Sequence, residues 1–379
     1  MFSLPLTLLL PLLALCPSIS NARPSHPRHK DATTGVGSMM LTDMSRSDPF
    51  AKDGRPRSIM VSSFFPVSNC LQRTSIPYMP PGTGKFIDEK FGAYGLPNGT
   101  FREFTIEVCG KLSKHAQCPP GGWPLVLFSG ALGTSRHLYN IMLQNVAARG
   151  YLVVSIDHPY DADIVEFTNG TIIHGVDIGS DAEIELALDA RVSDIIFAQN
   201  QLRKRSVADK LFPGHLQNGR LPKVAVFGHS LGGAAAAAAM SKSTDLLGGA
   251  NLDGTFFGPV VTDGLDRPFM LIGHENKTRE TDPSWDAIWP HLHGWKKQYE
   301  VKETAHYSFS DLPFVAFASG IQDLLPVEVE GLLGRMNGER VMKLTTSYVV
   351  AFLDMFLKSE AEGAFQKLGK KFSEVVEVV

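Results

Sequence analysis

The fold is decided by the stretch Lys223-Val224-Ala225-Val226-Phe227-Gly228-His229-Ser230-Leu231-Gly232-Gly233, which is followed by a run of alanines up to residue 239. Residues 224–227 predict a short buried strand, because they form a brief apolar run bounded by a turn signal. Residues 234–239 predict a helix, because alanine is the strongest helix former. A strand must therefore pass into a helix within a few residues.

The residues between this strand and this helix have the pattern G-x-S-x-G, from Gly228 to Gly232. On so sharp a turn the serine is held in strained backbone angles, and the glycines avoid collisions with the strand and the helix. The Ser230 hydroxyl is then exposed at a helix N-terminus, and the backbone N–H of Leu231 points to where a tetrahedral oxyanion would form. A tight turn with only a structural role is the alternative, but the strand–turn–helix setting favours a nucleophile.

Working outward, strands and helices alternate from residue 123 onward, which is typical of a parallel sheet with crossover helices on both faces. No linker divides residues 58–360, so these residues are expected to form one catalytic domain. The expected strands are 58–65, 103–109, 125–128, 152–156, 224–227, 247–252, 268–272 and 298–302, and the expected helices beside the alanine run are 135–149, 182–201 and 341–357.

The ends of the chain differ from this core. Residues 4–15 are an apolar run before a small-residue cleavage site, so residues 1–22 are read as a signal peptide, too short to span a bilayer. Residues 23–57 are rich in proline, serine and basic side chains and are expected to be a flexible tail or propeptide, and residues 361–379 a C-terminal tail. Because no later stretch is long and apolar enough for a membrane helix, a secreted protein without a transmembrane anchor is expected.

Composition limits the function classes. With 379 residues, 44% hydrophobic and 20% charged, the chain is typical of a globular protein, and its net charge of −3 gives no argument for binding nucleic acid. No zinc-spaced Cys/His cluster occurs, and no metal or cofactor is expected. Three sequons predict glycosylation at Asn98, Asn169 and Asn276.

Cys70, Cys109 and Cys118 remain after the leader, which takes Cys16 with it. In an oxidising compartment they predict one disulfide and one free thiol, with the pairing open. Cys109 with Cys118 is the first guess, because the two flank a short polar loop.

A serine nucleophile needs a histidine base and a carboxylate that orients it, and in α/β-hydrolases the chain order is serine, acid, histidine. His306 follows the last expected strand and is the expected base. Asp253 ends the first strand after Ser230 and Glu275 ends the second, so the residues alone leave the acid open between them. The histidines set aside as base are His229, His274, His291 and His293. Leu132, in the glycine-containing loop 129–134, is expected to supply the second backbone N–H of the oxyanion hole beside that of Leu231.

These motifs together resemble the plasma-type platelet-activating-factor acetylhydrolases, over roughly residues 58–357. The resemblance rests on the stretch from Gly228 to Gly233, on the Leu-Asp pair ending at Asp253, and on His306 in His-Tyr-Ser-Phe-Ser-Asp. It rests also on Leu132-Gly133 with Arg136 and Leu138-Tyr139. The chain is also similar to fungal secreted members of that group and, more distantly, to bacterial polyester hydrolases and cutinase-like enzymes.

The resemblance implies Ser230 as nucleophile, Asp253 rather than Glu275 as acid, His306 as base, and the N–H groups of Leu132 and Leu231 as oxyanion hole. It implies an esterase that removes the short sn-2 acyl group of phospholipids such as platelet-activating factor. It also implies a peripheral lipid surface as a partner. A cutinase-type or polyester carboxylesterase or a lipase is the alternative, followed by a non-catalytic binding protein on the same scaffold. Four aromatic residues are candidates for the acyl pocket, with ordinary core packing as the alternative: Phe256, Phe257, Trp285 and Trp289.

Overall fold

The structure, a computed structural model, describes residues 33–112, 119, 122–216 and 222–379. The expected signal peptide lies outside these residues, as do residues 23–32 of the expected tail and Cys118.

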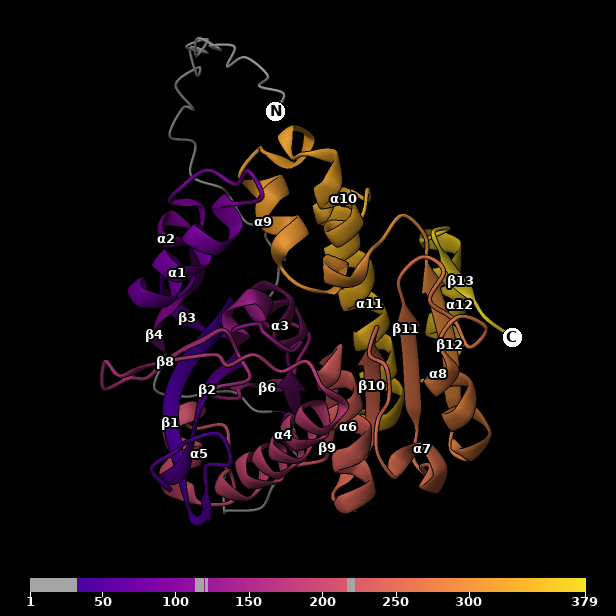
Figure 1. Ribbon diagram of the computed structural model, residues 1–379, viewed down its shortest axis with the longest axis horizontal. Helices are drawn as coiled ribbons and strands as arrows, with labels where there is room; N and C mark the ends of the chain where they lie inside the picture. Colours follow the sequence, from indigo (N-terminus) through magenta and orange to yellow (C-terminus); the bar gives the residue numbers. More distant parts are fainter. Residues whose placement is uncertain (1–32, 113–118, 120–121, 217–221) are drawn as a thin grey trace, which may run out of the picture.

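Within the described residues a nine-stranded sheet runs through the molecule, in the order β1-β2-β6-β5-β9-β10-β11-β12-β13 (Figure 1). The six strands from β6 to β12 in this order are parallel, while β1, β2 and β13 are antiparallel to their neighbours. The strands are β1 Thr33–Ser47, β2 Pro56–Val67, β5 Leu125–Ser129, β6 Leu152–Asp157, β9 Val224–His229, β10 Leu246–Leu252, β11 Phe269–Gly273, β12 Lys296–Val301 and β13 Val375–Glu377. The mostly parallel sheet expected from the sequence is confirmed.

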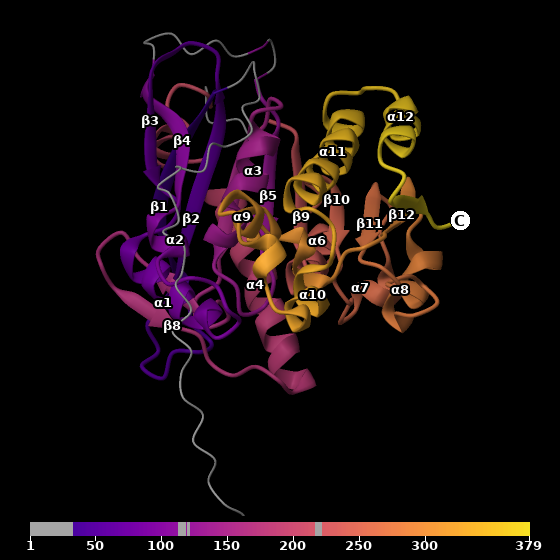
Figure 2. The same ribbon diagram turned by 90° about the horizontal axis from the view of Figure 1, so that it is seen from above.

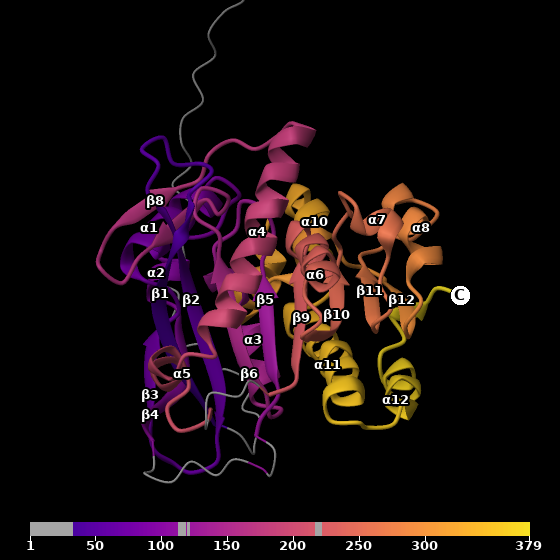
Figure 3. The ribbon, with the colours of Figure 1, turned by 90° about the horizontal axis from the view of Figure 1, so that it is seen from below.

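Helices cover both faces of this sheet, and Figures 2 and 3 show α11 and α12 on one side of strands β10 to β12 and α7 and α8 on the other. Alternate residues of β9 enter two separate cores, Ala225 and Phe227 on one face and Val224 and Val226 on the other. A strand buried on both faces reads as a continuous apolar run, which is why residues 224–227 were recognisable in the sequence.

The first face carries α3 Asn140–Ala147, α9 Leu312–Ala318, α11 Gly338–Leu357 and α12 Gly363–Lys371. The second carries α4 Asp181–Gln201, α5 Arg205–Leu211, α6 Leu231–Lys242, α7 Val260–Asp263 and α8 Pro283–Ile288. The remaining elements are α1 Pro81–Gly92, α2 Thr100–Glu103, α10 Val327–Leu333, the 3-10 turns η1 Arg136–Tyr139, η2 Trp289–His291, η3 His306–Phe309 and η4 Gln322–Leu324, and the two-stranded sheets β3 Cys70–Pro77 with β4 Thr105–Leu112 and β7 Ile164–Glu166 with β8 Ile172–His174.

The expected flexible tail at residues 23–57 is wrong for residues 33–47, which form strand β1. This strand pairs with β2 from Thr33 opposite Val67 to Ser47 opposite Pro56. It lies at the edge of the sheet with many polar side chains in partly exposed positions. An edge strand of this composition has no regular alternation of apolar and polar residues, so the sequence pattern did not predict it.

The expected C-terminal tail at residues 361–379 is also part of the packed domain. Helix α12 and strand β13 lie there, and β13 pairs with β12. Phe365 and Phe372 are buried in the core of the first face. The domain therefore extends to both ends of the described chain.

The guessed pairing of Cys109 with Cys118 is wrong, because the structure joins Cys70 to Cys109. The two cysteines lie on adjacent antiparallel strands, with Arg73 of β3 opposite Cys109 of β4. Their Cα atoms are 5.6 Å apart, within the usual range for a disulfide. Strand pairing, and not nearness in the sequence, selected the partner.

Asn98, Asn169 and Asn276 are exposed, and their glycosylation stays a prediction. No helix in the described part of the chain is long and apolar enough to cross a bilayer.

Candidate active site

The turn between β9 and α6 has the strained geometry that the sequence predicted. Ser230 has φ 57° and ψ −127°, which is costly for a residue with a side chain. A Cβ atom on Gly228 would lie 2.2 Å from the backbone of Gly232, and one on Gly232 would lie 2.0 Å from the carbonyl oxygen of Ser129. The backbone N–H of Ser230 donates to the carbonyl of Leu252 at 2.8 Å, which ties the turn to β10.

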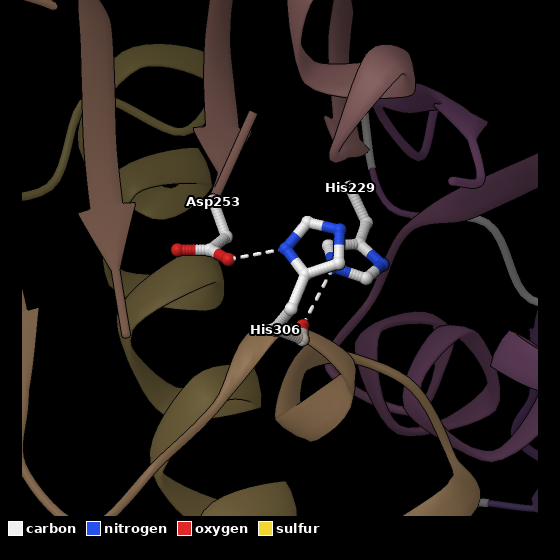
Figure 4. Close-up of side chains that lie close together, drawn as sticks. All are labelled: His229, Asp253 and His306. Carbon is white, nitrogen blue, oxygen red and sulfur yellow. Dashed lines mark hydrogen bonds and ion pairs between the residues drawn. The ribbon is translucent and has the colours of Figure 1, made fainter. Parts of the chain in front are cut away.

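Three side chains from distant parts of the chain meet at this turn. The Ser230 hydroxyl lies 3.0 Å from Nε2 of His306, and Nδ1 of His306 donates to Oδ2 of Asp253 at 2.5 Å. Asp253 directly follows β10, and His306 begins η3 after β12. Figure 4 shows the His306 ring between Asp253 and His229. This arrangement can move a proton from the serine to a histidine whose tautomer is fixed by a carboxylate.

The surroundings of Asp253 favour its ionised form. Burial by itself raises the pKa of this carboxyl group, but hydrogen bonds from His274 and His306 outweigh burial and hold the pKa below its ordinary value. Glu275, the other candidate acid, is paired with Arg335 at 3.4 Å. Of the two candidate acids, the geometry therefore brings Asp253 into contact with His306, the expected base.

His229 supports the site from behind. Its Nε2 donates to the backbone carbonyl of His306 at 2.8 Å, and its Nδ1 accepts from the Tyr139 hydroxyl at 2.9 Å. Burial, followed by the nearby charge of His306, lowers the pKa of His229 to about 3, so the ring stays neutral. His229 thus positions the backbone that carries His306 and does not face the serine as a base.

The loop after β5 holds the second expected oxyanion donor, Leu132. The Tyr139 hydroxyl accepts from the backbone N–H of Ala131 at 2.9 Å, and Thr134 Oγ1 donates to the carbonyl of Ala131 at 2.7 Å. Gly133 has φ 69°, a conformation that favours glycine. These contacts fix the turn at Leu132, whereas Leu231 lies at the first position of α6. The role of both N–H groups stays a prediction.

A second Ser-His-Asp arrangement lies behind this loop. Ser129 Oγ is 2.9 Å from Nε2 of His158, and Nδ1 of His158 is 3.0 Å from Asp194. All three residues are at most 2% exposed, so an ester has no access to them. Arg191 donates to Ser129 Oγ at 3.0 Å and to the carbonyl of Gly130 at 2.5 Å. The cluster therefore holds the start of the loop at residues 129–134.

Sequence reasoning missed this cluster, although His158 lies just beyond the carboxyl end of β6, where functional side chains gather in such sheets. Its partners come from β5 and α4. Only the packing of α4 on the sheet shows that they meet.

The acyl-pocket interpretation is wrong for Phe256 and Trp285, which are 3% and 0% exposed and belong to the core of the second face. The Trp285 indole N–H donates to the carbonyl of Gly254 at 2.7 Å, so this residue supports the loop after Asp253. Phe257 lines a groove of about 780 Å³ bordered by α4, α6 and α7, whose lining contains none of Ser230, Asp253 and His306. The cations of Arg279 and Lys296 lie 4.2 Å and 4.7 Å from the centre of a ring of Trp289.

Among the described residues, possible metal-ligand atoms of His229, Asp253 and His306 lie within 4.8 Å of one another. Each of these residues already makes the hydrogen bonds described above. The proton-transfer arrangement accounts for this grouping.

The chain has similarity to known proteins over most of its length. The family described as "Platelet-activating factor acetylhydrolase, isoform II" matches residues 98–178 and 209–369. A protein of Arthroderma benhamiae, named "Probable 1-alkyl-2-acetylglycerophosphocholine esterase", is 32% identical over 358 residues, which is 89% of each chain. The "Platelet-activating factor acetylhydrolase" of Cavia porcellus is 26% identical over 257 residues, 62% of this chain and 58% of that protein.

A solved structure of a ferulic acid esterase from Streptomyces cinnamoneus has a similar fold, with a TM-score of 0.75 and 28% identity. The match covers 92% of this chain and 96% of that one. These proteins are named for reactions at a carboxylic ester bond.

Proposed function

The chain belongs to the platelet-activating factor acetylhydrolase isoform II family and is a carboxylic ester hydrolase, and from this premise we propose that it removes the short sn-2 acyl group of phospholipids such as 1-alkyl-2-acetylglycerophosphocholine. The observation that carries the proposal is the hydrogen-bonded chain from Ser230 through His306 to Asp253. The named activities of the two curated relatives support the choice of substrate.

In the proposed mechanism, Ser230 Oγ attacks the ester carbonyl while Nε2 of His306 takes the hydroxyl proton. Asp253 stabilises the imidazolium that forms. The backbone N–H groups of Leu132 and Leu231 bind the oxyanion, and each such donor is worth about 3 kcal/mol in the transition state. His306 then protonates the departing lysophospholipid oxygen, and water activated by the same ring releases the short acid from Ser230.

Hydrolysis of p-nitrophenyl esters of increasing acyl length tests this proposal, with Ser230→Ala as the control. Activity confined to short acyl chains and lost in the control is expected, followed by release of acetate from 1-alkyl-2-acetylglycerophosphocholine. The fold of the ferulic acid esterase favours a broader carboxylesterase as second candidate. Serine-dependent activity mainly on long acyl or aromatic esters would move the assignment there. If the wild type and the control were equally inactive on all esters, the chain would be a non-catalytic binding protein on the same scaffold.

We also propose that the enzyme meets its substrate at a phosphatidylcholine surface. Phe317, Leu324 and Val327 are 37%, 78% and 69% exposed, on α9, η4 and α10. Helix α10 packs against η3, which begins with the proposed base His306, so these exposed apolar side chains lie on elements packed around the proposed site. Asp323 and Glu328 beside the patch suit a zwitterionic surface better than an anionic one.

Cosedimentation with phosphatidylcholine vesicles measures this docking. The double variant Leu324→Ser with Val327→Ser should bind vesicles less while hydrolysing soluble p-nitrophenyl acetate like the wild type. Met44→Ser is the matched control, because Met44 is also 78% exposed but lies on edge strand β1. Equal loss in both variants would contradict a localised docking surface.

Secretion belongs to the same proposal. The leader-like residues 1–22 and the three exposed sequons support it. The disulfide between Cys70 and Cys109 is typical of an oxidising compartment. Recovery of glycosylated protein from the medium of expressing cells tests it.

A further inference from the structure

His274, which directly follows β11, makes two hydrogen bonds to one oxygen of Asp253. Its Nδ1 donates to Asp253 Oδ1 at 2.6 Å, and its backbone N–H donates to the same oxygen at 2.9 Å. His306 occupies the other oxygen, Oδ2. The carboxylate is therefore held between two imidazole rings.

The sheet register creates this contact. Strands β10 and β11 are parallel, with Leu252 opposite Ile272, so the residues that follow them leave the sheet side by side. Asp253 has φ 62°, and its backbone N–H donates to the carbonyl of Ile272 at 2.7 Å. The strained aspartate is thus fastened to the same strand end that carries His274.

We propose that His274 is a positioning residue for the acid of the triad, and that its ring N–H holds the Asp253 carboxylate so that Oδ2 points at Nδ1 of His306. This inference rests on the proposed function, which makes Asp253 the acid. His306 and the backbone N–H of residue 274 give each carboxylate oxygen one donor, and the ring of His274 adds the shorter of the two bonds to Oδ1, 2.6 Å against 2.9 Å. The ring therefore restricts rotation about the terminal torsion of the carboxylate beyond what the backbone N–H achieves alone. Misplacement of a catalytic group by about 1 Å costs on the order of a hundredfold in rate.

His274 is not a second base. Of the two histidines that contact Asp253, it is His306 that also contacts Ser230. The side chain of His274 is 32% exposed, and its fixed contact is the bond from Nδ1 to the carboxylate. Because the backbone N–H of residue 274 remains in any variant other than proline, replacing the side chain isolates the contribution of the ring.

Two substitutions at this position separate hydrogen bonding from packing. In His274→Ala, kcat for p-nitrophenyl acetate should fall about tenfold to a hundredfold while KM changes less than about threefold. In His274→Asn, the amide Nδ2 occupies nearly the position of the imidazole Nδ1, so kcat should recover to within about threefold of the wild type. His293→Ala, at an exposed histidine, is the matched control and should behave as the wild type.

The results distinguish this inference from the proposed function. If the wild type is active, Ser230→Ala and Asp253→Asn are inactive, and His274→Ala keeps kcat within about twofold, the positioning role is overturned while the triad stands. An asparagine variant as slow as the alanine variant also overturns it, because the hydrogen bond would then not be the cause. A wild type without serine-dependent activity overturns the proposed function itself. Thermal melts of each variant verify that the folded enzyme is being measured.

Discussion

Two carboxylates follow neighbouring strand ends in this site, and only one of them touches the base. Asp253 is buried against His306, whereas Glu275 pairs with Arg335. A carboxylate that orients the base also fixes which ring nitrogen carries the proton. The consequence of removing it should therefore be on kcat.

Asp253→Asn should lower kcat by about 10⁴-fold, because an amide in this place favours the wrong tautomer of His306. Steady-state kinetics on p-nitrophenyl acetate measure the change. Glu275→Gln is the matched control and should keep kcat within about threefold of the wild type. A large loss in the glutamine variant with little loss in the asparagine variant would reverse the assignment of the acid.

His229 should make stability depend on pH. Its folded pKa is about 3 because of burial, whereas an exposed histidine titrates near 6.5. As pH falls below about 6.5, the unfolded chain takes up a proton that the folded chain does not, so the folded state loses about 1.4 kcal/mol per pH unit down to about pH 3.

The variant His229→Gln lacks this group. The difference in unfolding free energy between wild type and variant should therefore shrink by about 1.2 kcal/mol between pH 6 and pH 5, since the unfolded histidine is already mostly protonated at pH 6. Urea unfolding at each pH measures it, and the contributions of His137 and His158, whose pKa values burial also lowers, cancel in the comparison. A difference that stays constant across this interval would contradict a buried neutral His229.

At the scale of elements, the joint between β9 and α6 depends on the absence of side chains. Gly232→Ala would place a methyl group 2.0 Å from the carbonyl oxygen of Ser129, where β5 ends. Backbone cannot move aside cheaply, so the variant should lose esterase activity and several degrees of melting temperature. Gly369→Ala is the matched control, because a Cβ there meets nothing within 4 Å in helix α12.

In the control, replacing a helical glycine with alanine should stabilise by up to about 1 kcal/mol and leave activity unchanged. Thermal melts and activity on p-nitrophenyl acetate measure both variants. If Gly232→Ala kept full activity, the close approach of β5 to the turn between β9 and α6 would be excluded.

At the scale of the whole molecule, buried Arg57 of β2 ties the sheet edge to α4. Its guanidinium donates to Asp194 at 2.8 Å, to Asp48 after β1 at 3.0 Å, and to the carbonyl of Pro159 at 3.0 Å. Asp194 in turn contacts His158, and His158 contacts Ser129, the first residue of the loop 129–134 that holds the expected oxyanion donor Leu132. One charged network thus connects the edge of the sheet with the active site.

Arg57→Met should lower the free energy of unfolding by about 3–5 kcal/mol, because it leaves the buried carboxylate of Asp48 without its cation and that of Asp194 with only the partly exposed Arg46. Arg55→Met is the control, since Arg55 and its partner Asp53 are 51% and 54% exposed in their side chains, and no measurable loss is expected. Urea unfolding at neutral pH compares the two variants. Equal stability would show that the network does not hold the sheet edge.

The features that could be predicted from the sequence are those set by residues that lie close together in the chain. Residues 224–240 contain the buried strand, the glycines and the alanine helix in one stretch. The sharp turn between β9 and α6, with Ser230 on it, could therefore be predicted from the local pattern. The parallel sheet followed from alternating strands and helices, and His306 from its place after the last strand. The residues alone left Asp253 and Glu275 open, and the resemblance to the acetylhydrolases favoured Asp253.

The sequence by itself therefore determined the mostly parallel sheet, the sharp turn between β9 and α6, and the order of the site residues along the chain. Each of these features depends on short-range periodicity and turn chemistry. The tertiary structure alone decided the contact of His274 with Asp253, the pairing of Cys70 with Cys109, the place of β1 at the sheet edge and the burial of Trp285. Each of these depends on which strands lie side by side and in what register. That choice is made by packing energy summed over the whole core, and no local stretch of sequence carries it.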